Sequence, residues 1–267
     1  MRKLITLATD FGMRDAYVAQ MKGVLYAQGP SDLEVVDLSH ELGAQQLFEA
    51  ALFVRDAWPR FPFGTIHVVV VDPGVGSARQ ALLCSYAGQL MVGPDNGVMS
   101  LLAGADAQLF VLDPKRVVAA PLSATFHGRD LFAPAAARLA AGALPEDLGT
   151  PTDQLVRLAW PALEVRSSEL RGQVLHVDRF GNLISNISRA DLTSWLAPSE
   201  WRRLRVTAAG SGELALSRTY ADAAVGSTLA LFGSSDLLEI AVTNGSAAAL
   251  LGAGVGAEVC LSVMPQS

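Results

Sequence analysis

Hydrophobic residues in the first half of the chain alternate between runs typical of strands and spacings typical of helices. Short apolar runs predict strands at Leu4–Ala8, Leu33–Leu38, Ile66–Val71, Leu82–Ser85, Leu90–Val92 and Leu109–Leu112. Apolar positions at helical spacing predict helices at Tyr17–Tyr26, Gln45–Trp58 and Leu131–Ala141. This alternation predicts an α/β fold, a mainly parallel sheet covered by helices in an α/β/α arrangement.

The pattern changes over residues 144–163, which are rich in Pro, Asp and Thr, as linkers are. Beyond them, short strands with turn signals between them are predicted at Gly172–Asp178, Leu183–Ile187, Arg203–Ala208, Gly226–Phe232, Leu237–Val242 and Ala257–Val263. This spacing is typical of a small β-barrel or sandwich. We therefore expect an α/β domain at 1–150, a linker at 151–168 and a smaller β-barrel domain at 169–267.

Polar clusters interrupt the apolar pattern at element boundaries, in the segments 9–12, 72–79, 125–130 and 178–183. Asp10 and Asp72 both follow predicted parallel strands, and ligands gather at the carboxyl ends of such strands. One such cluster is ordinary in a globular protein. Several at element boundaries indicate one composite site.

The segment VVVVDPGVGSARQ, residues 68–80, allows three interpretations. A phosphate-binding P-loop needs Gly-Lys-Ser/Thr before a helix, but no lysine is present and the residues after Arg79 look like a strand. A plain turn, with Asp72 capping its own backbone and Arg79 in solvent, would be favoured if the segment stood alone. The other polar clusters favour the third interpretation, in which the turn presents Asp72 and Arg79 to a reaction.

Composition restricts the possible partners. The chain is 51% hydrophobic and 17% charged, and its net charge is −6. Because the sequence also has no cluster of Lys or Arg residues, we expect that it does not bind nucleic acid. No stretch approaches the roughly 20 apolar residues that a membrane span needs, so no membrane contact is expected. Cys84 and Cys260 lie in apolar segments far apart in the sequence, which predicts buried free thiols and a cytoplasmic location.

The polar clusters also carry a resemblance to a known family. The segments TDFG, VVDPGVGSAR, GPDNGV, FHGRD and DRFGN occur in this order over nearly the whole chain. Together they resemble the S-adenosylmethionine hydroxide adenosyltransferase family, whose relatives include the fluorinase and the chlorinase. The resemblance implies an α/β domain followed by a small β-barrel domain. It also implies an enzyme that converts S-adenosylmethionine and water to adenosine and methionine without a metal or an organic cofactor.

The resemblance implies that Asp72, Arg79 and His127 are the catalytic residues. S-adenosylmethionine carries a sulfonium, already a good leaving group, so the difficult step is to activate water, whose pKa is about 15.7. We expect a water shared by Asp72 and His127, with Arg79 fixing the pair, and which residue takes the proton stays open. A histidine that only caps its own helix is the alternative for His127.

Substrate-binding residues are implied by the same matches. Asp10 stands where the family's carboxylate accepts hydrogen bonds from both ribose hydroxyls, although it could also cap the helix that follows. Phe180 and Asn182 match the adenine-binding stretch, although Gly181-Asn182 would also suit a hairpin turn. Asp178 matches a residue that faces the methionine amino group. Weaker matches place Ser234 at the methionine end, Glu239 as a carboxylate within the apolar run LLEIAV, and the backbone carbonyl of Val242 at the adenine amine.

Absent features separate the related activities. Halide-binding relatives carry a tyrosine where Asp72 stands, the fluorinase has a serine where Gly128 stands, and its long insertion after Arg79 is missing here, so hydrolysis is favoured. The alternatives are a halogenase or another transferase, and a sensor that binds S-adenosylmethionine or adenosine without turnover. A dinucleotide-dependent reductase fits the first half but lacks the glycine fingerprint. The histidines and cysteines are scattered, so no metal site is predicted.

The candidate residues are divided between the predicted domains. By resemblance, we expect a homotrimer in which the α/β domain of one subunit and the β domain of the next share each active site. A head-to-tail contact of this kind closes into a ring when the rotation allows it. The alternative is a cleft between the domains of one monomer.

Overall fold

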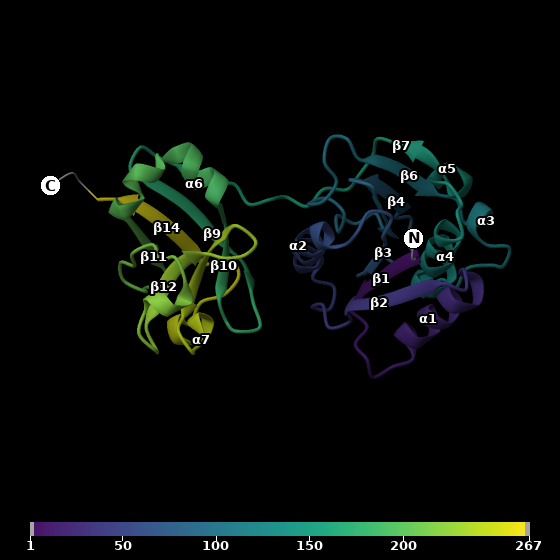
Figure 1. Cartoon of the computed structure of the whole chain (residues 1–267), viewed down its shortest axis with the longest axis horizontal. Coiled ribbons are helices and arrows are strands. Elements are labelled where there is room, and N and C mark those ends of the chain that lie inside the picture. The colour runs from purple at the N-terminus through teal and green to yellow at the C-terminus, as the bar shows by residue number, and fades with distance from the viewer. Residues whose placement is uncertain (1–2, 265–267) are drawn as a thin grey trace. The chain divides into compact units, whose positions relative to one another are not determined.

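The chain folds into two compact units whose boundary in the sequence lies between Leu158 and Ala159. A computed structural model describes residues 3–264 of the 267-residue chain (Figure 1). The boundary lies inside the segment 151–168, where the change of pattern predicts a linker.

The N-terminal unit is built on a mixed sheet with the strand order β2-β1-β3-β5-β4-β6-β7 (Figure 1). Its strands are β1 (Lys3–Thr9), β2 (Leu33–Ser39), β3 (Ile66–Val70), β4 (Ala81–Tyr86), β5 (Gln89–Pro94), β6 (Gln108–Leu112) and β7 (Gly149–Thr152). Strand β1 is parallel to β2 and β3, and β3 is parallel to β5. Strand β4 is antiparallel to β5 and β6, and β6 is antiparallel to β7.

The prediction of a mainly parallel sheet is wrong for the β4–β7 side. Ala87 and Gly88 alone connect β4 to β5, with φ angles of 46° and 73°. Two consecutive left-handed residues form the tight hairpin turn that matches the twist of paired strands, so β4 and β5 become antiparallel neighbours. A parallel pair would need a crossover of about a dozen residues. Apolar runs alone do not report the direction of a strand.

Helices cover both faces of this sheet, because alternate residues of a strand point to opposite sides. Val68 and Val70 of β3 pack in a core with residues of α1 and α4, whereas Val69 and Val71 pack in a core with residues of α2. The α/β/α layering is therefore present. The helical segments are α1 (Tyr17–Gln28), α2 (Leu47–Ala57), η1 (Trp58–Arg60), α3 (Pro114–Val117), the π-helical turn η2 (Gly128–Phe132), α4 (Ala133–Ala140) and α5 (Pro145–Leu148).

A buried histidine, His67, lies in the N-terminal core on β3. Its Nδ1 is 2.7 Å from Thr6 Oγ1, its Nε2 is 2.8 Å from Gln89 Oε1, and its ring stacks on Trp58 with centroids 4.5 Å apart. Burial lowers the pKa of His67 to about 4, although the hydrogen bond with Gln89 favours the charged form. The ring is therefore neutral in the folded chain at neutral pH.

We expect His67 to destabilise the folded chain in acid. An unfolded histidine takes up its proton near pH 6.5, whereas folded His67 takes it up only near pH 4. The free energy of unfolding therefore falls as the pH drops from 6.5 to 4, and the loss is about 2 kcal/mol at pH 5. Urea unfolding at about pH 7.5 and about pH 5 measures this loss. A His67→Gln variant should lose less stability on acidification than a His176→Gln control. Equal losses in the two variants would contradict the prediction.

The C-terminal unit is an antiparallel sheet that is nearly closed into a barrel, with the order β11-β14-β9-β10-β13-β12 and with β8 beside β9. The segment between the edge strands joins them, because Leu214 pairs with Val206 and Leu216 pairs with Ala230. The predicted small β-barrel is thus observed as a barrel-like sheet. Its elements are β8 (Glu164–Val165), β9 (Glu169–Val177), β10 (Leu183–Ser188), α6 (Arg189–Trp195), η3 (Pro198–Arg203), β11 (Leu204–Ala208), η4 (Tyr220–Asp222), β12 (Thr228–Phe232), β13 (Leu237–Val242), α7 (Ala247–Leu251) and β14 (Glu258–Val263).

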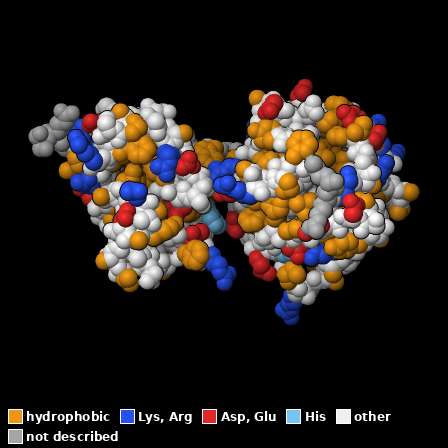
Figure 2. All heavy atoms as spheres, viewed as in Figure 1, with side chains coloured by type: hydrophobic (Ala, Val, Ile, Leu, Met, Phe, Trp, Pro, Cys, Tyr) orange, Lys and Arg blue, Asp and Glu red, His pale blue; other side chains and the backbone are white. Residues whose placement is uncertain are grey.

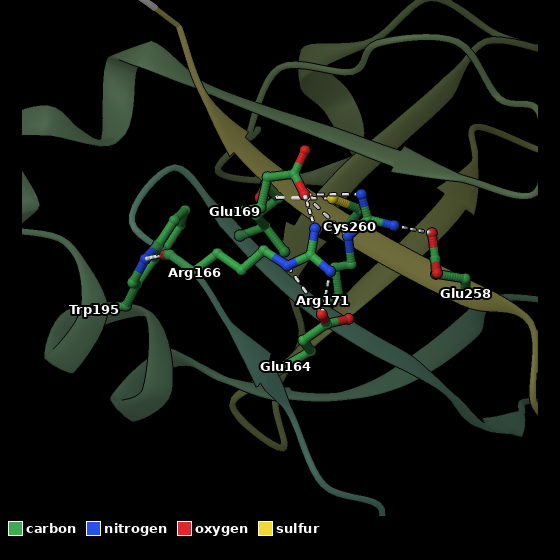
Figure 3. A network of polar contacts seen from close by, with 8 residues as sticks. Glu164, Arg166, Glu169, Arg171, Trp195, Glu258 and Cys260 are labelled. Atoms are coloured by element: carbon green, nitrogen blue, oxygen red, sulfur yellow. Dashed lines mark hydrogen bonds and ion pairs between the residues drawn. The ribbon is translucent and has the colours of Figure 1, made fainter.

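An ion-pair network lies across β8, β9 and β14 (Figure 3). Arg166 contacts Glu164, and Arg171 contacts Glu169 at 2.7 Å and Glu258 at 3.1 Å. These side chains are 30% to 65% exposed, so water screens the pairs and each contributes little to stability. The network joins neighbouring strands, and we interpret it as architecture rather than chemistry.

Candidate active site

The carboxyl ends of β1 and β3 lie side by side in the N-terminal sheet. Thr9, the last residue of β1, pairs with Val70, the last residue of β3. Asp10 follows β1 directly, and Asp72 follows β3 after one residue. Both aspartates therefore belong to the edge at which α/β sheets bind ligands.

Arg79 contacts both Asp72 and His127 at this edge. Arg79 Nε donates to Asp72 Oδ1 at 2.9 Å, and Arg79 Nη2 contacts both Asp72 Oδ2 and, at 2.8 Å, His127 Nδ1. The side chains of Arg79 and Asp72 are 9% and 5% exposed, so this bidentate pair is largely shielded from water. The interpretation of Arg79 as a solvated side chain is therefore wrong.

The turn from Asp72 to Arg79 is shaped by its glycines and by a serine. Ser77 N–H donates to the Gly74 carbonyl at 3.0 Å, and Ser77 Oγ accepts from Arg79 N–H at 3.2 Å. Gly76 has a φ of +77°, and a Cβ there would lie 2.3 Å from the Ala124 carbonyl oxygen, so another residue would be strained and would clash. The chain continues into strand β4, so the turn lacks the helix N-terminus on which phosphate loops rely.

His127 stands immediately before the π-helical turn η2. In the described chain its side chain does not cap that turn, and its Nδ1 lies next to Arg79 instead. A guanidinium can only donate, so Nδ1 must accept, and the neutral ring then carries its proton on Nε2. Burial and the charge of Arg79 lower the pKa of His127, although Asp72 and Asp130 oppose them. The ring is therefore neutral at neutral pH.

Asp10 binds the loop that precedes α2. Its Oδ2 accepts from Gln45 N–H at 3.0 Å. Helix α1 begins at Tyr17 with Ala16 at its N-cap, so the alternative role of Asp10 as the cap of that helix is wrong. A carboxylate that is fixed through one oxygen can still accept hydrogen bonds at the other.

A separate cavity of about 810 Å³ lies in the C-terminal unit. It is bordered by the turn after β9, the turn after β12, the η4 segment and β13, and its volume is in the range of small-molecule sites. The six positions that the sequence suggests for this domain all line it. These are Asp178, Phe180, Asn182, Ser234, Glu239 and Val242.

The turn after β9 is held by the Asp178 carboxylate. Its Oδ1 accepts from the backbone N–H groups of Phe180 and Asn182, both at 2.9 Å, and its Oδ2 accepts from Asn182 Nδ2 at 2.9 Å. Gly181 has a φ of +82°. The segment is thus both the predicted tight turn and part of the cavity wall. Asn182 is 6% exposed, whereas Phe180 is 75% exposed.

Glu239 forms a second carboxylate of the cavity and is bound by Tyr220, which sequence reasoning missed. Tyr220 Oη donates to Glu239 Oε2 at 2.7 Å. Burial raises the pKa of Glu239 and so does the charge of Asp178, whereas the Tyr220 hydrogen bond opposes them. A Cβ on Gly233 would lie 1.5 Å from Glu239 Oε1, so this glycine makes room for the carboxylate. Tyr220 begins the short helical turn η4, which the sequence pattern does not predict.

Among residues 3–264, no group of three or more His, Cys, Asp or Glu is placed to hold a metal ion. None of the helices in that range has the length and apolar character to cross a bilayer. Figure 2 shows basic side chains interspersed with acidic ones on the face it displays. Cys84 is buried as predicted, Cys260 is only half-buried, and burial raises the pKa of both thiols.

Comparisons with known proteins cover both units. Residues 5–149 match the N-terminal domain, and residues 172–260 the C-terminal domain, of the S-adenosylmethionine (SAM) hydroxide adenosyltransferases. The chain is 40% identical to an (R)-S-adenosyl-L-methionine hydrolase of Thermus thermophilus over 95% of this chain and 97% of that one. A fluorinase of Nocardia brasiliensis is 29% identical over 90% of each chain. The crystal structure of an uncharacterized conserved protein from Thermotoga maritima matches with a TM-score of 0.86 at 32% identity, covering 97% and 99% of the two chains.

Proposed function

The chain belongs to the S-adenosylmethionine hydroxide adenosyltransferase family and hydrolyses S-adenosyl-L-methionine to adenosine and L-methionine, and we propose that Asp72, Arg79 and His127 activate the water. Relatives named (R)-S-adenosyl-L-methionine hydrolase are 33% to 40% identical to it. The observation that carries the catalytic roles is that Arg79 contacts both Asp72 and His127 at the edge of the sheet where α/β proteins bind ligands, with Arg79 and Asp72 largely shielded from water.

The reaction needs a nucleophile more than it needs an acid. Water attacks C5′ of the ribose, the C5′–S bond breaks, and its electron pair neutralises the sulfonium, so that methionine leaves as a thioether. The oxygen that forms the new bond must lose one proton. Groups that orient the water and accept this proton therefore decide the rate.

The hydrogen bond between Arg79 and His127 supports a division of labour in this step. Because His127 Nδ1 accepts from Arg79, the neutral ring presents Nε2–H, which would donate to the water oxygen rather than take its proton. Asp72 is then the proton acceptor, and Arg79 holds both side chains in place. This sharpens the expectation of a water shared by Asp72 and His127.

Substrate contacts are proposed for each unit. In the N-terminal unit, Asp10 receives the ribose hydroxyls. In the cavity of the C-terminal unit, the Asn182 amide oxygen and the Val242 carbonyl face the adenine amine, and the exposed Phe180 ring stacks on the base. Asp178, Ser234 and Glu239 bind the methionine end. Asp178 also supports the turn, so part of its effect on binding is indirect.

We expect turnover without a metal, an organic cofactor or halide. A carboxylate beside the nucleophile repels a halide ion but assists water, so Asp72 disfavours halogenation. Purified protein incubated with S-adenosyl-L-methionine in chelator and chloride-free buffer should release adenosine and methionine at an undiminished rate, measured by chromatography. The same assay with added fluoride or chloride is the control. A requirement for a divalent metal, or 5′-halo-adenosine as the main product, would contradict this mechanism.

The assembly is also a proposal. We propose a homotrimer in which the α/β unit of one subunit and the barrel-like unit of the next complete each active site. The candidate residues support this, because they form two clusters in different units and one substrate must meet both. A cytoplasmic location stays a prediction from the sequence.

A further inference from the structure

A buried histidine that the proposed reaction does not use lies beside the Asp10 loop. His40 follows β2 and is 4% exposed. Its Nδ1 is 2.9 Å from Oγ1 of Thr9, the fully buried last residue of β1, and its Nε2 is 3.1 Å from Asp37 Oδ1. Asp37 in turn pairs with Lys22 of α1 at 2.5 Å.

The polar groups in this series of contacts agree in direction. His40 Nε2 lies beside the Asp37 carboxylate without an aligned hydrogen bond, and the negative charge of Asp37 favours the tautomer with the proton on Nε2, so His40 Nδ1 accepts from the Thr9 hydroxyl. Thr9 Oγ1 in turn accepts from Phe11 N–H at 3.3 Å. This N–H belongs to the peptide that follows Asp10, so the chain of contacts runs from the surface pair at Asp37 to the backbone of Asp10.

Further bonds tie the loop after β1 to the loop after β2. Gly12 N–H donates to the His40 carbonyl at 2.7 Å, with Gly12 in a left-handed conformation at φ +66°. Gln45 N–H donates to the Asp10 carboxylate itself. The two loops therefore hold Asp10 from both its backbone and its side chain.

We propose that Thr9 and His40 are positioning residues, which aim the Asp10 carboxylate at the ribose hydroxyls. This inference rests on the proposed role of Asp10. It assigns a function to a buried histidine whose Nε2 has no aligned hydrogen-bond partner within residues 3–264, an arrangement that costs stability. Positioning through Asp10 should act on substrate binding and leave the proton transfer at Asp72 intact.

Strand β1 offers a matched control for the test. Thr6 is also fully buried on β1, and its hydroxyl also contacts a buried histidine, His67, at 2.7 Å, but it lies in the interior of the strand. Thr9→Val and Thr6→Val each delete one such hydroxyl without changing shape. We expect Thr9→Val to raise KM for S-adenosyl-L-methionine by about tenfold, with kcat changed less than about threefold, and Thr6→Val to leave KM within about twofold. Thr9→Ser, which keeps the hydroxyl, should retain the KM of the unmodified enzyme.

Steady-state kinetics of these variants decide the proposal. An unchanged KM in Thr9→Val, or equal KM increases in Thr9→Val and Thr6→Val, would overturn it. In an Asp10→Ala background, Thr9→Val should add less than about a twofold change, because its effect passes through Asp10. If Asp10→Ala itself binds substrate normally, Asp10 does not bind the ribose, and the positioning role of Thr9 and His40 is contradicted too. If Asp10→Ala binds substrate weakly but Thr9→Val binds it normally, only the positioning role is contradicted.

A second variant keeps the test decisive if Thr9→Val does not fold. Asp37→Asn changes a partly exposed position and removes the acceptor charge beside His40. We expect it to raise KM by about threefold with kcat unchanged, since the negative charge that favours the proton on His40 Nε2 is removed. An unchanged KM in a folded Asp37→Asn enzyme would overturn the proposal.

Discussion

Asp72→Asn, Arg79→Ala and His127→Ala are each expected to lower kcat by roughly 10²–10⁴-fold while KM stays within about tenfold, because positioned proton transfer contributes effects of that size. Asn at position 72 keeps the shape but is a poor proton acceptor. Without Arg79, both Asp72 and His127 lose the group that orients them. Single-turnover and steady-state kinetics measure the change, with circular dichroism to verify folding.

A matched set of variants separates catalytic from binding roles. Asp10→Ala should mainly raise KM and leave kcat nearly unchanged, in contrast to the three variants above. His127→Gln retains an N–H donor near the position of Nε2, so it should keep more activity than His127→Ala if the histidine orients the water. Equal losses in His127→Gln and His127→Ala would make His127 the base instead, and normal turnover in His127→Ala would remove it from the mechanism.

Two inactive variants are expected to restore activity when they are mixed. Asp72→Asn damages the α/β unit, and Asn182→Ala damages the cavity of the C-terminal unit. If neighbouring subunits share each site, an equal mixture that exchanges freely carries both intact halves at about a quarter of its interfaces. Activity at low substrate concentration should therefore rise from near zero to about a quarter of the unmodified level.

The control for this experiment pairs two defects in the same unit. A mixture of Asp72→Asn with Arg79→Ala can assemble no intact site by exchange between subunits, so it should stay inactive. Exchange itself is measured with labelled subunits. No recovery despite proven exchange, or full activity in a monomer, would contradict the shared site.

Local sequence was enough to predict the strands β1–β6 and β9–β14 and the helices α1, α2 and α4, whereas the short elements β7, β8, α3, α5, α6 and α7 were not predicted. Residues 68–71 are valines, and the structure buries them alternately on the two faces of the sheet, because strand periodicity requires it. The direction of β4 was not predictable in the same way. It depends on left-handed angles at Ala87 and Gly88, and apolar runs carry no information on them.

The candidate residues were found from motifs, and the fold then grouped them into two clusters. Asp178 and Ser234 share one cavity, and Asp72 and His127 share one arginine. The sequence does not identify Tyr220 as a site residue, because its role depends on its hydrogen bond to Glu239 in the folded cavity.

The sequence by itself determined the types of element, the turn at Gly74–Gly76 and the side chains able to do acid–base chemistry, since these follow from local periodicity and residue type. Only the tertiary structure decided which nitrogen of His127 is protonated and which loops hold Asp10. The direction of a hydrogen bond depends on the positions of groups that are far apart in the chain, and only folding brings Arg79 to His127 and Thr9 to His40.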